Sequence, residues 1–240
     1  MFLYTGATIH FYIICSQACY HVFLRTDPPP GERTGDYNSV EEMIDDLLNG
    51  FDEDRLQEIE REEDIPGTFK AFREDLIEKN ELMVPFYKGE NMPLKLWDNG
   101  STSITLHYCE SFSRPWIFYS GLMGDDVVSI CTMYIDDELV DEANEKGANW
   151  LINKIAPGTN TYLAPTFENQ KQHNFIKAIY EDYITFDGFS AKALIREDND
   201  DSRLWIDFVY ENLLVEIRIK PDAFERGILK DLSFKAIPLQ

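Results

Sequence analysis

Two hairpin signals in the last third of the chain constrain the fold more than any other feature of the sequence. Asp187-Gly188 joins two alternating stretches, Tyr180 to Phe186 and Phe189 to Arg196. Such a dipeptide favours the tight turn between antiparallel strands, because both residues tolerate a positive φ. In the same way Glu211-Asn212 joins the stretches Arg203 to Tyr210 and Leu213 to Lys220. The sequence therefore predicts a meander of four strands.

Apolar and polar residues alternate along the fourth of these strands. Its apolar residues share one face, and its charged residues Glu216, Arg218 and Lys220 share the other. Side chains point to opposite faces at successive strand positions, so this pattern is typical of a sheet with one face in the core. We therefore expect one face to be buried and the other to be exposed to solvent.

Similar signals occur earlier in the chain and after the meander. Hairpins are predicted for Leu94 to Trp97 with Ser103 to Cys109, around Asp98-Asn99-Gly100, and for Trp116 to Leu122 with Val127 to Ile135, around Gly124-Asp125. After the meander, Pro221-Asp222 begins a short helix that Asp222 and Glu225 cap, and Leu232 to Ala236 forms a last strand.

Helical periodicity dominates a shorter part of the chain. Ser39 and Glu42 form a capping-box pair ahead of a helix that ends near Gly50. Further helical segments are predicted for Asp54 to Arg61, for Thr68 to Lys79 and for Glu138 to Ile155, the last with an interruption at Gly147.

These elements together predict the fold class α+β. We expect a curved antiparallel sheet built from hairpins, with an acidic N-terminal helical region packed on it. Residues 1–24 are a candidate signal or membrane-anchor segment, and residues 25–38, which include Pro28-Pro29-Pro30, are a Pro-rich linker. Residues 39–240 form the α+β domain, helical at 39–80 and mainly antiparallel sheet at 82–240.

The charge of the chain excludes whole classes of partner. It contains 44 acidic residues against 22 Lys and Arg, a formal net charge of −22. Binding of nucleic acid or of an anionic membrane surface needs the opposite sign of charge. The acidic residues concentrate between Glu32 and Glu81, where 18 of them stand against 6 basic residues. That segment is either a solvated outer surface or a surface that complements a basic partner.

The first 24 residues contain no Asp, Glu, Lys or Arg and are mostly apolar. Their length suits a bilayer span or an export signal, although His10, Gln17 and His21 weaken insertion. Ser16-Gln17-Ala18-Cys19 is similar to the cleavage motif of bacterial lipoproteins, which makes Cys19 a candidate for lipidation. Packing of the segment on the domain is the alternative.

A resemblance points in the same direction. Four segments in roughly the last 60 residues form a series of strands: Ile184 to Gly188, Leu204 to Tyr210, Leu213 to Ile219 and Asp231 to Phe234. The order of these strands resembles the closing sheet of uncharacterised extracytoplasmic lipoproteins of Gram-positive bacteria. The resemblance implies an exported location and no activity, because these residues include no catalytic motif.

Motifs for nucleotide binding and for the common hydrolases are absent from the sequence, so no cofactor is expected and the catalytic residues are unknown. His107 and Cys109 share a face of one predicted strand, and Cys131 on a neighbouring strand would complete a metal site or a thiol-imidazole pair. The alternative is a half-buried histidine beside free core thiols. The acidic stretch Glu197 to Ser202 lacks the spacing of a calcium loop and is predicted to be a solvated turn.

Three functions fit these observations. The first is a non-enzymatic extracytoplasmic domain that binds a protein or small ligand through its sheet, and that contacts a membrane only through residues 1–24. The second is a cytosolic acidic inhibitor or immunity-type protein that binds a basic partner. The third is an uncharacterised hydrolase whose turnover would depend on His107.

Overall fold

The computed structural model describes residues 36–37, 39–49, 74–91, 104–109, 114–155, 176–199 and 202–239. The predicted strand Leu94 to Trp97 and the predicted helix Asp54 to Arg61 lie outside these residues, as does the segment 1–24.

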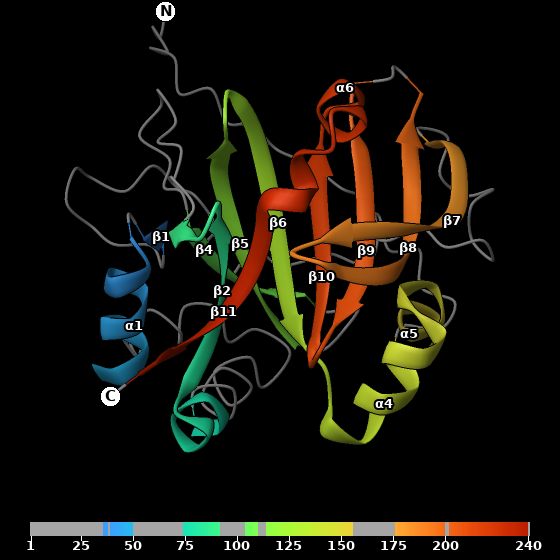
Figure 1. The fold of residues 1–240 in the computed structure, drawn as a ribbon. Coiled ribbons are helices and arrows are strands. Elements are labelled where there is room, and N and C mark those ends of the chain that lie inside the picture. Colours follow the sequence, from blue (N-terminus) through green and yellow to red (C-terminus); the bar gives the residue numbers. More distant parts are fainter. Residues whose placement is uncertain are drawn as a thin grey trace, which may run out of the picture.

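One antiparallel sheet organises the described part of the chain (Figure 1). Its strands, in spatial order, are β1 (Asp36–Tyr37), β4 (Ile104–Cys109), β5 (Arg114–Met123), β6 (Asp126–Tyr134), β10 (Leu213–Ile219), β9 (Leu204–Tyr210), β8 (Phe189–Asp198) and β7 (Ile176–Phe186). A second sheet contains β11 (Leu232–Pro238), β2 (Glu81–Tyr87) and β3 (Glu90–Asn91). The predicted fold class, α+β with a curved antiparallel sheet, is confirmed.

Helices lie between and after these strands. They are α1 (Val40–Asn49), α4 (Asp137–Lys146), α5 (Ala148–Ile155), α6 (Pro221–Glu225) and the 3-10 helix η3 (Ile228–Asp231), and residues 74–79 are also helical. The predicted cap of α1 is present, because the backbone N–H of Glu42 donates to the Ser39 hydroxyl at 3.1 Å.

The predicted hairpins that fall on described residues are confirmed. Phe186 pairs with Phe189 across Asp187-Gly188, and Met123 pairs with Asp126 across Gly124-Asp125. Asp187 and Gly188 both have a positive φ, 44° and 74°, as the turn requires. The β7–β8 hairpin bends so strongly that its tip crosses in front of β9 and β10 (Figure 1).

Two apolar clusters cover the two faces of the large sheet. On one face the strands pack against β2, β11, α1 and α6, with Leu82, Phe208 and Phe234 among the buried residues. On the other face they pack against α4 and α5, with Leu151 and Leu214 among the buried residues. Within the described residues both faces are therefore covered, which contradicts the expectation that one face is exposed to solvent.

Two further expectations about element ends need correction. Asp36–Tyr37 pair with β4, so the sheet extends into residues 25–38, the range predicted as linker. The N-cap position of α6 is Lys220, not Asp222, and no side chain caps the helix there. The Asp222 carboxylate instead accepts a hydrogen bond from Arg226 one turn later, at 2.7 Å.

Candidate functional site

Four charged side chains project from three adjacent strands toward the face that α4 and α5 cover. Arg196 lies on β8, Asp207 on β9, and Glu216 and Arg218 on β10. We call the apolar residues that pack against α4 and α5 the α4–α5 cluster; it includes Leu194 on β8, Val209 on β9 and Leu214 on β10. Each of the four charged residues is two or four positions from the cluster residue on its own strand. Strand alternation therefore places all four on this face.

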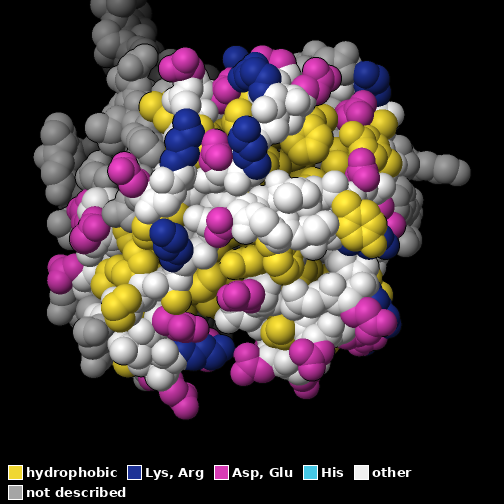
Figure 2. Space-filling view, viewed as in Figure 1, with side chains coloured by type: hydrophobic (Ala, Val, Ile, Leu, Met, Phe, Trp, Pro, Cys, Tyr) yellow, Lys and Arg dark blue, Asp and Glu magenta, His cyan; other side chains and the backbone are white. Residues whose placement is uncertain are grey.

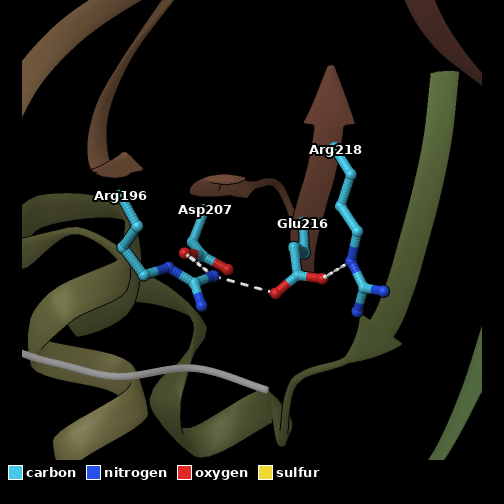
Figure 3. Close-up of polar contacts among 4 residues, drawn as sticks. All are labelled: Arg196, Asp207, Glu216 and Arg218. Atoms are coloured by element: carbon cyan, nitrogen blue, oxygen red, sulfur yellow. Dashed lines mark hydrogen bonds and ion pairs between the residues drawn. The ribbon is translucent and has the colours of Figure 1, made fainter. Parts of the chain in front are cut away.

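These four residues form one continuous network, which we call the buried charge network (Figure 3). Nη2 of Arg196 bonds to Oδ2 of Asp207 and, at 2.8 Å, to Oε2 of Glu216. Nε of Arg218 donates to Oε1 of Glu216 at 2.7 Å. The side chains of Arg196, Asp207 and Glu216 are at most 2% exposed, whereas that of Arg218 is 25% exposed.

The two carboxyl groups of the network differ in proton affinity. Burial raises the pKa of Asp207 to about 7, despite the opposing charge of Arg196. Burial also acts to raise the pKa of Glu216, but Arg218 and Arg196 together hold that pKa below its usual value. The cause of the difference is geometric, because Glu216 bonds to two guanidinium groups and Asp207 to one.

Asp207 has one further property that matters for its chemistry. Its Oδ1 is buried and has no hydrogen-bond partner among the described residues. An unpaired buried oxygen disfavours the ionised carboxylate, in agreement with the direction of the pKa shift. The carboxyl can therefore hold a proton, but with a side chain 1% exposed it is poorly placed to exchange that proton with a substrate. The network is better suited to fixing the alignment of β8, β9 and β10.

A second charged feature lies at the surface, at the lower end of the view in Figures 1 and 2. We call it the acidic end, and it consists of residues of α4 and of the helical residues 74–79. Its acidic members are Asp137, Glu138, Asp141, Glu142, Glu145, Glu74, Asp75 and Glu78.

Two lysines are the basic residues of the acidic end. Lys79 bridges the two helical segments, because its Nζ lies 3.2 Å from Asp75 and 3.4 Å from Asp137. Lys146 pairs with Glu142 and lies over the ring of Trp150 at 4.9 Å. Each lysine is thus held by groups of its own surface, and most of the acidic charge stays uncompensated.

The structure separates the three residues predicted to form a metal site or a thiol-imidazole pair. His107 and Cys109 lie on β4 and Cys131 on β6, with β5 hydrogen-bonded between the two strands. Strands two apart in a sheet are separated by about 9.6 Å, beyond the reach of a disulfide. His107 is in register with Trp116 and Cys131 with Phe118, so the two residues are also offset along the strands by two positions. The expectation that Cys131 lies on a neighbouring strand is therefore wrong. Cys131 is a buried cysteine that forms no disulfide bond, the alternative that the sequence also allowed.

The other predicted positions add no site. Cys19 lies outside the described residues. In the acidic stretch 197–202, Asp198 accepts a hydrogen bond from the Ser202 hydroxyl at 3.4 Å. Across the described residues, no group of three or more His, Cys, Asp or Glu is arranged to hold a metal ion.

Sequence reasoning missed the buried charge network because it assigned Glu216 and Arg218 to a solvent-exposed face. The signal that could have identified it is charge complementarity across the meander. Asp207 and Glu216 are directly opposite in register, and two acids side by side on an exposed face repel each other unless cations lie next to them. Arg196 and Arg218, on the same face, are those cations.

No protein-family model, no curated protein and no solved structure matches this chain.

Proposed function

We propose that this protein is a non-enzymatic binding domain, that its partner is a basic protein, and that the acidic end is the contact surface. The observation that carries the proposal is the uncompensated charge of α4. Within the described residues Glu138, Asp141 and Glu145 are exposed and form no ion pair or hydrogen bond through their carboxylates. Figure 2 shows acidic side chains predominating around this end of the molecule.

Fixed charge is what makes such a surface selective. Ala143 anchors α4 in the core, and the Asn144 amide donates to the backbone oxygens of Val140 and Glu211 at 2.9 and 2.7 Å. The helix therefore presents its carboxylates from a defined position. Preorganised charge of one sign speeds association with a partner of opposite sign and suppresses wrong partners.

The same observations favour this surface over the sheet. Binding of a protein partner through the sheet needs a broad accessible sheet face, and in the described residues the apolar residues of both faces pack against the protein's own helices and strands. The acidic end needs no such rearrangement.

The location of the protein is a separate part of the proposal. An extracytoplasmic or membrane-anchored location rests on residues 1–24, and a cytoplasmic location is the alternative. None of the described helices is long and apolar enough to cross a bilayer. Basic partners occur in both locations, so recognition through the acidic end does not depend on where the protein is. The intact mass of the native protein distinguishes the two locations.

The test compares two double variants with the same change in charge. Glu138→Lys with Asp141→Lys reverses the acidic end, and Asp125→Lys with Glu225→Lys reverses two exposed acids on the β5–β6 turn and on α6. Partners of the wild-type chain are crosslinked in its host and identified by mass spectrometry, and the dissociation constant of the purified pair is then measured at low and high salt.

We expect the partner to be basic and its affinity to fall at least about tenfold with added salt and in the acidic-end variant. The control variant should retain the affinity within about twofold, because rim charges far from a contact contribute little. A partner that binds the acidic-end variant as tightly as the wild type would overturn the proposal.

A further inference from the structure

A second row of side chains crosses the helix-covered face beside the buried charge network. Arg196, Trp205, Arg218, Ser129 and Ser120 are successive partners in register across β8, β9, β10, β6 and β5. Alternation along each strand places all five on the face of the α4–α5 cluster, because Phe118 and Cys131 of that cluster are two positions from Ser120 and Ser129. An arginine and two serine hydroxyls are thereby brought into one line.

Arg218 has donors that the buried charge network does not use. Its Nε is committed to Glu216, and Figure 3 shows its two terminal nitrogens pointing away from that carboxylate. Neither terminal nitrogen has a hydrogen-bond partner among the described residues. The pair with Glu216 fixes the orientation of the guanidinium, and its partial exposure leaves the fork accessible. A planar fork of this kind binds carboxylate and phosphate oxygens in bidentate fashion.

Ser120 supplies the second, independent observation. Its hydroxyl is fully buried, yet Oγ has no hydrogen-bond partner among the described residues. In native structures nearly every buried hydroxyl group forms a hydrogen bond. A buried hydroxyl without one therefore indicates that a hydrogen-bonding partner, such as a ligand, is missing. Ser129 lies between Ser120 and Arg218 and is half-buried. β6 lies between β10 and β5, so these two strands are about 9.6 Å apart, a distance that a long arginine side chain and one small anion together can span.

The charges around this row favour an anion. Arg203, directly before β9, and Lys220, directly after β10, are exposed and lie on the same face as Trp205 and Arg218. Two acids lie near them. The Asp198 carboxylate accepts a hydrogen bond from Ser202, and Asp222, which interacts with Lys220, is paired with Arg226. The acids of the buried charge network are already bonded to Arg196 and Arg218. The acids of this corner thus already have partners, and Arg203 and Lys220 add positive charge beside Arg218.

We propose that Arg218, Ser129 and Ser120 bind the oxyanion group of a small molecule, a phosphate or a carboxylate. The terminal nitrogens of Arg218 donate to two oxygens of the group, and the two serine hydroxyls donate to the oxygens that remain. This site lies on the sheet and is independent of the acidic end and of the protein partner proposed for it.

The experiment uses the full chain and measures its thermal unfolding in the presence of inorganic phosphate, sulfate or acetate at constant ionic strength, with chloride as the balancing ion. Constant ionic strength is needed because salt alone reduces the self-repulsion of so acidic a protein. Ligand that binds the native state raises the midpoint of unfolding in a saturable manner. The three anions distinguish a tetrahedral from a planar group.

The decisive variant is Ser120→Ala with Ser129→Ala. It keeps the pair between Arg218 and Glu216, and removal of an unpaired buried hydroxyl does not cost stability, so the variant folds. We expect its dissociation constant for the preferred anion to be at least about tenfold weaker than that of the wild type. Ser190→Ala, at an exposed position of β8, is the matched control and should bind as the wild type does.

Two results would overturn the proposal. One is a midpoint that responds equally to all three anions and to chloride, which indicates screening and not a site. The other is a saturable response that the double serine variant retains in full, which places the anion elsewhere on the protein.

Discussion

At the scale of single residues, the buried charge network determines how the stability of the protein depends on pH. The pKa of Asp207 is about 7 in the folded protein, and its ordinary value is 3.8. Between these pH values the folded state holds a proton that the unfolded chain has released, so the free energy of unfolding falls as pH rises. Glu216 acts in the opposite sense, since its lowered pKa adds stability that is lost only below its ordinary value of 4.5.

Asp207→Asn tests this assignment, because the amide replaces the protonated carboxyl and can still accept from Arg196. From about pH 4.5 to 7 we expect the free energy of unfolding of the wild type to fall relative to that of this variant. The slope is at most about 1.4 kcal/mol per pH unit, the value for the release of one proton. Urea unfolding at several pH values measures it. Asp222→Asn, which breaks the exposed pair with Arg226, should follow the wild-type pH dependence. Parallel curves for the wild type and Asp207→Asn would show that Asp207 is not the titrating group.

At the scale of elements, one glycine joins the two helices that cover the network. Gly147 has φ +86°, and a Cβ at this position would lie 3.2 Å from the backbone oxygen of Lys192 on β8. The turn between α4 and α5 therefore depends both on a backbone conformation, φ 86° with ψ 177°, that essentially only glycine adopts and on the close approach of the helix pair to the sheet.

Gly147→Ala should lower the free energy of unfolding by about 1–3 kcal/mol, since the substitution adds backbone strain and a steric contact. Gly89→Ala separates the two causes. Gly89 has a similar φ of +80°, but a Cβ there would meet no atom within 4 Å. Chemical denaturation of both variants should show the larger loss for Gly147→Ala. Equal losses would mean that contact with β8 contributes nothing.

At the scale of the whole molecule, an aromatic cluster joins the two sheets. Phe234 of β11 lies 6.2 Å from Phe186, 6.4 Å from Phe208 and 5.6 Å from Tyr210, measured between ring centroids. These rings come from the second sheet, from the tip of the β7–β8 hairpin and from the centre of the large sheet. Their contact holds the bent hairpin against β11.

Phe234→Ala should therefore cost about 3–5 kcal/mol of unfolding free energy, the range for removing a buried aromatic ring. Phe189, which is 38% exposed and contacts Phe186 and Tyr210 at the edge of the cluster, is the control, and Phe189→Ala should cost clearly less. Calorimetry measures both. A larger loss for Phe189→Ala would place the junction of the two sheets outside this cluster.

The sequence by itself determined the local elements on which its signals act directly. Asp187-Gly188 and Gly124-Asp125 predicted the turns of two hairpins. Ser39 predicted the start of α1, and Gly147 predicted the break between α4 and α5. Each of these depends on the backbone preferences of a few consecutive residues, so the information lies within the segment itself.

Only the tertiary structure decided which faces are covered and which strands are neighbours. Alternation in β10 shows that Glu216 and Val215 point to opposite faces, but not that α4 and α5 cover the face of Glu216. Strand order places β5 between His107 and Cys131, and it brings Ser120 into line with Arg218. These relations join residues far apart in the chain through packing free energy, which no local pattern encodes. The predicted cysteine-histidine site therefore did not assemble, whereas the buried charge network and the serine-arginine row became visible only in the fold.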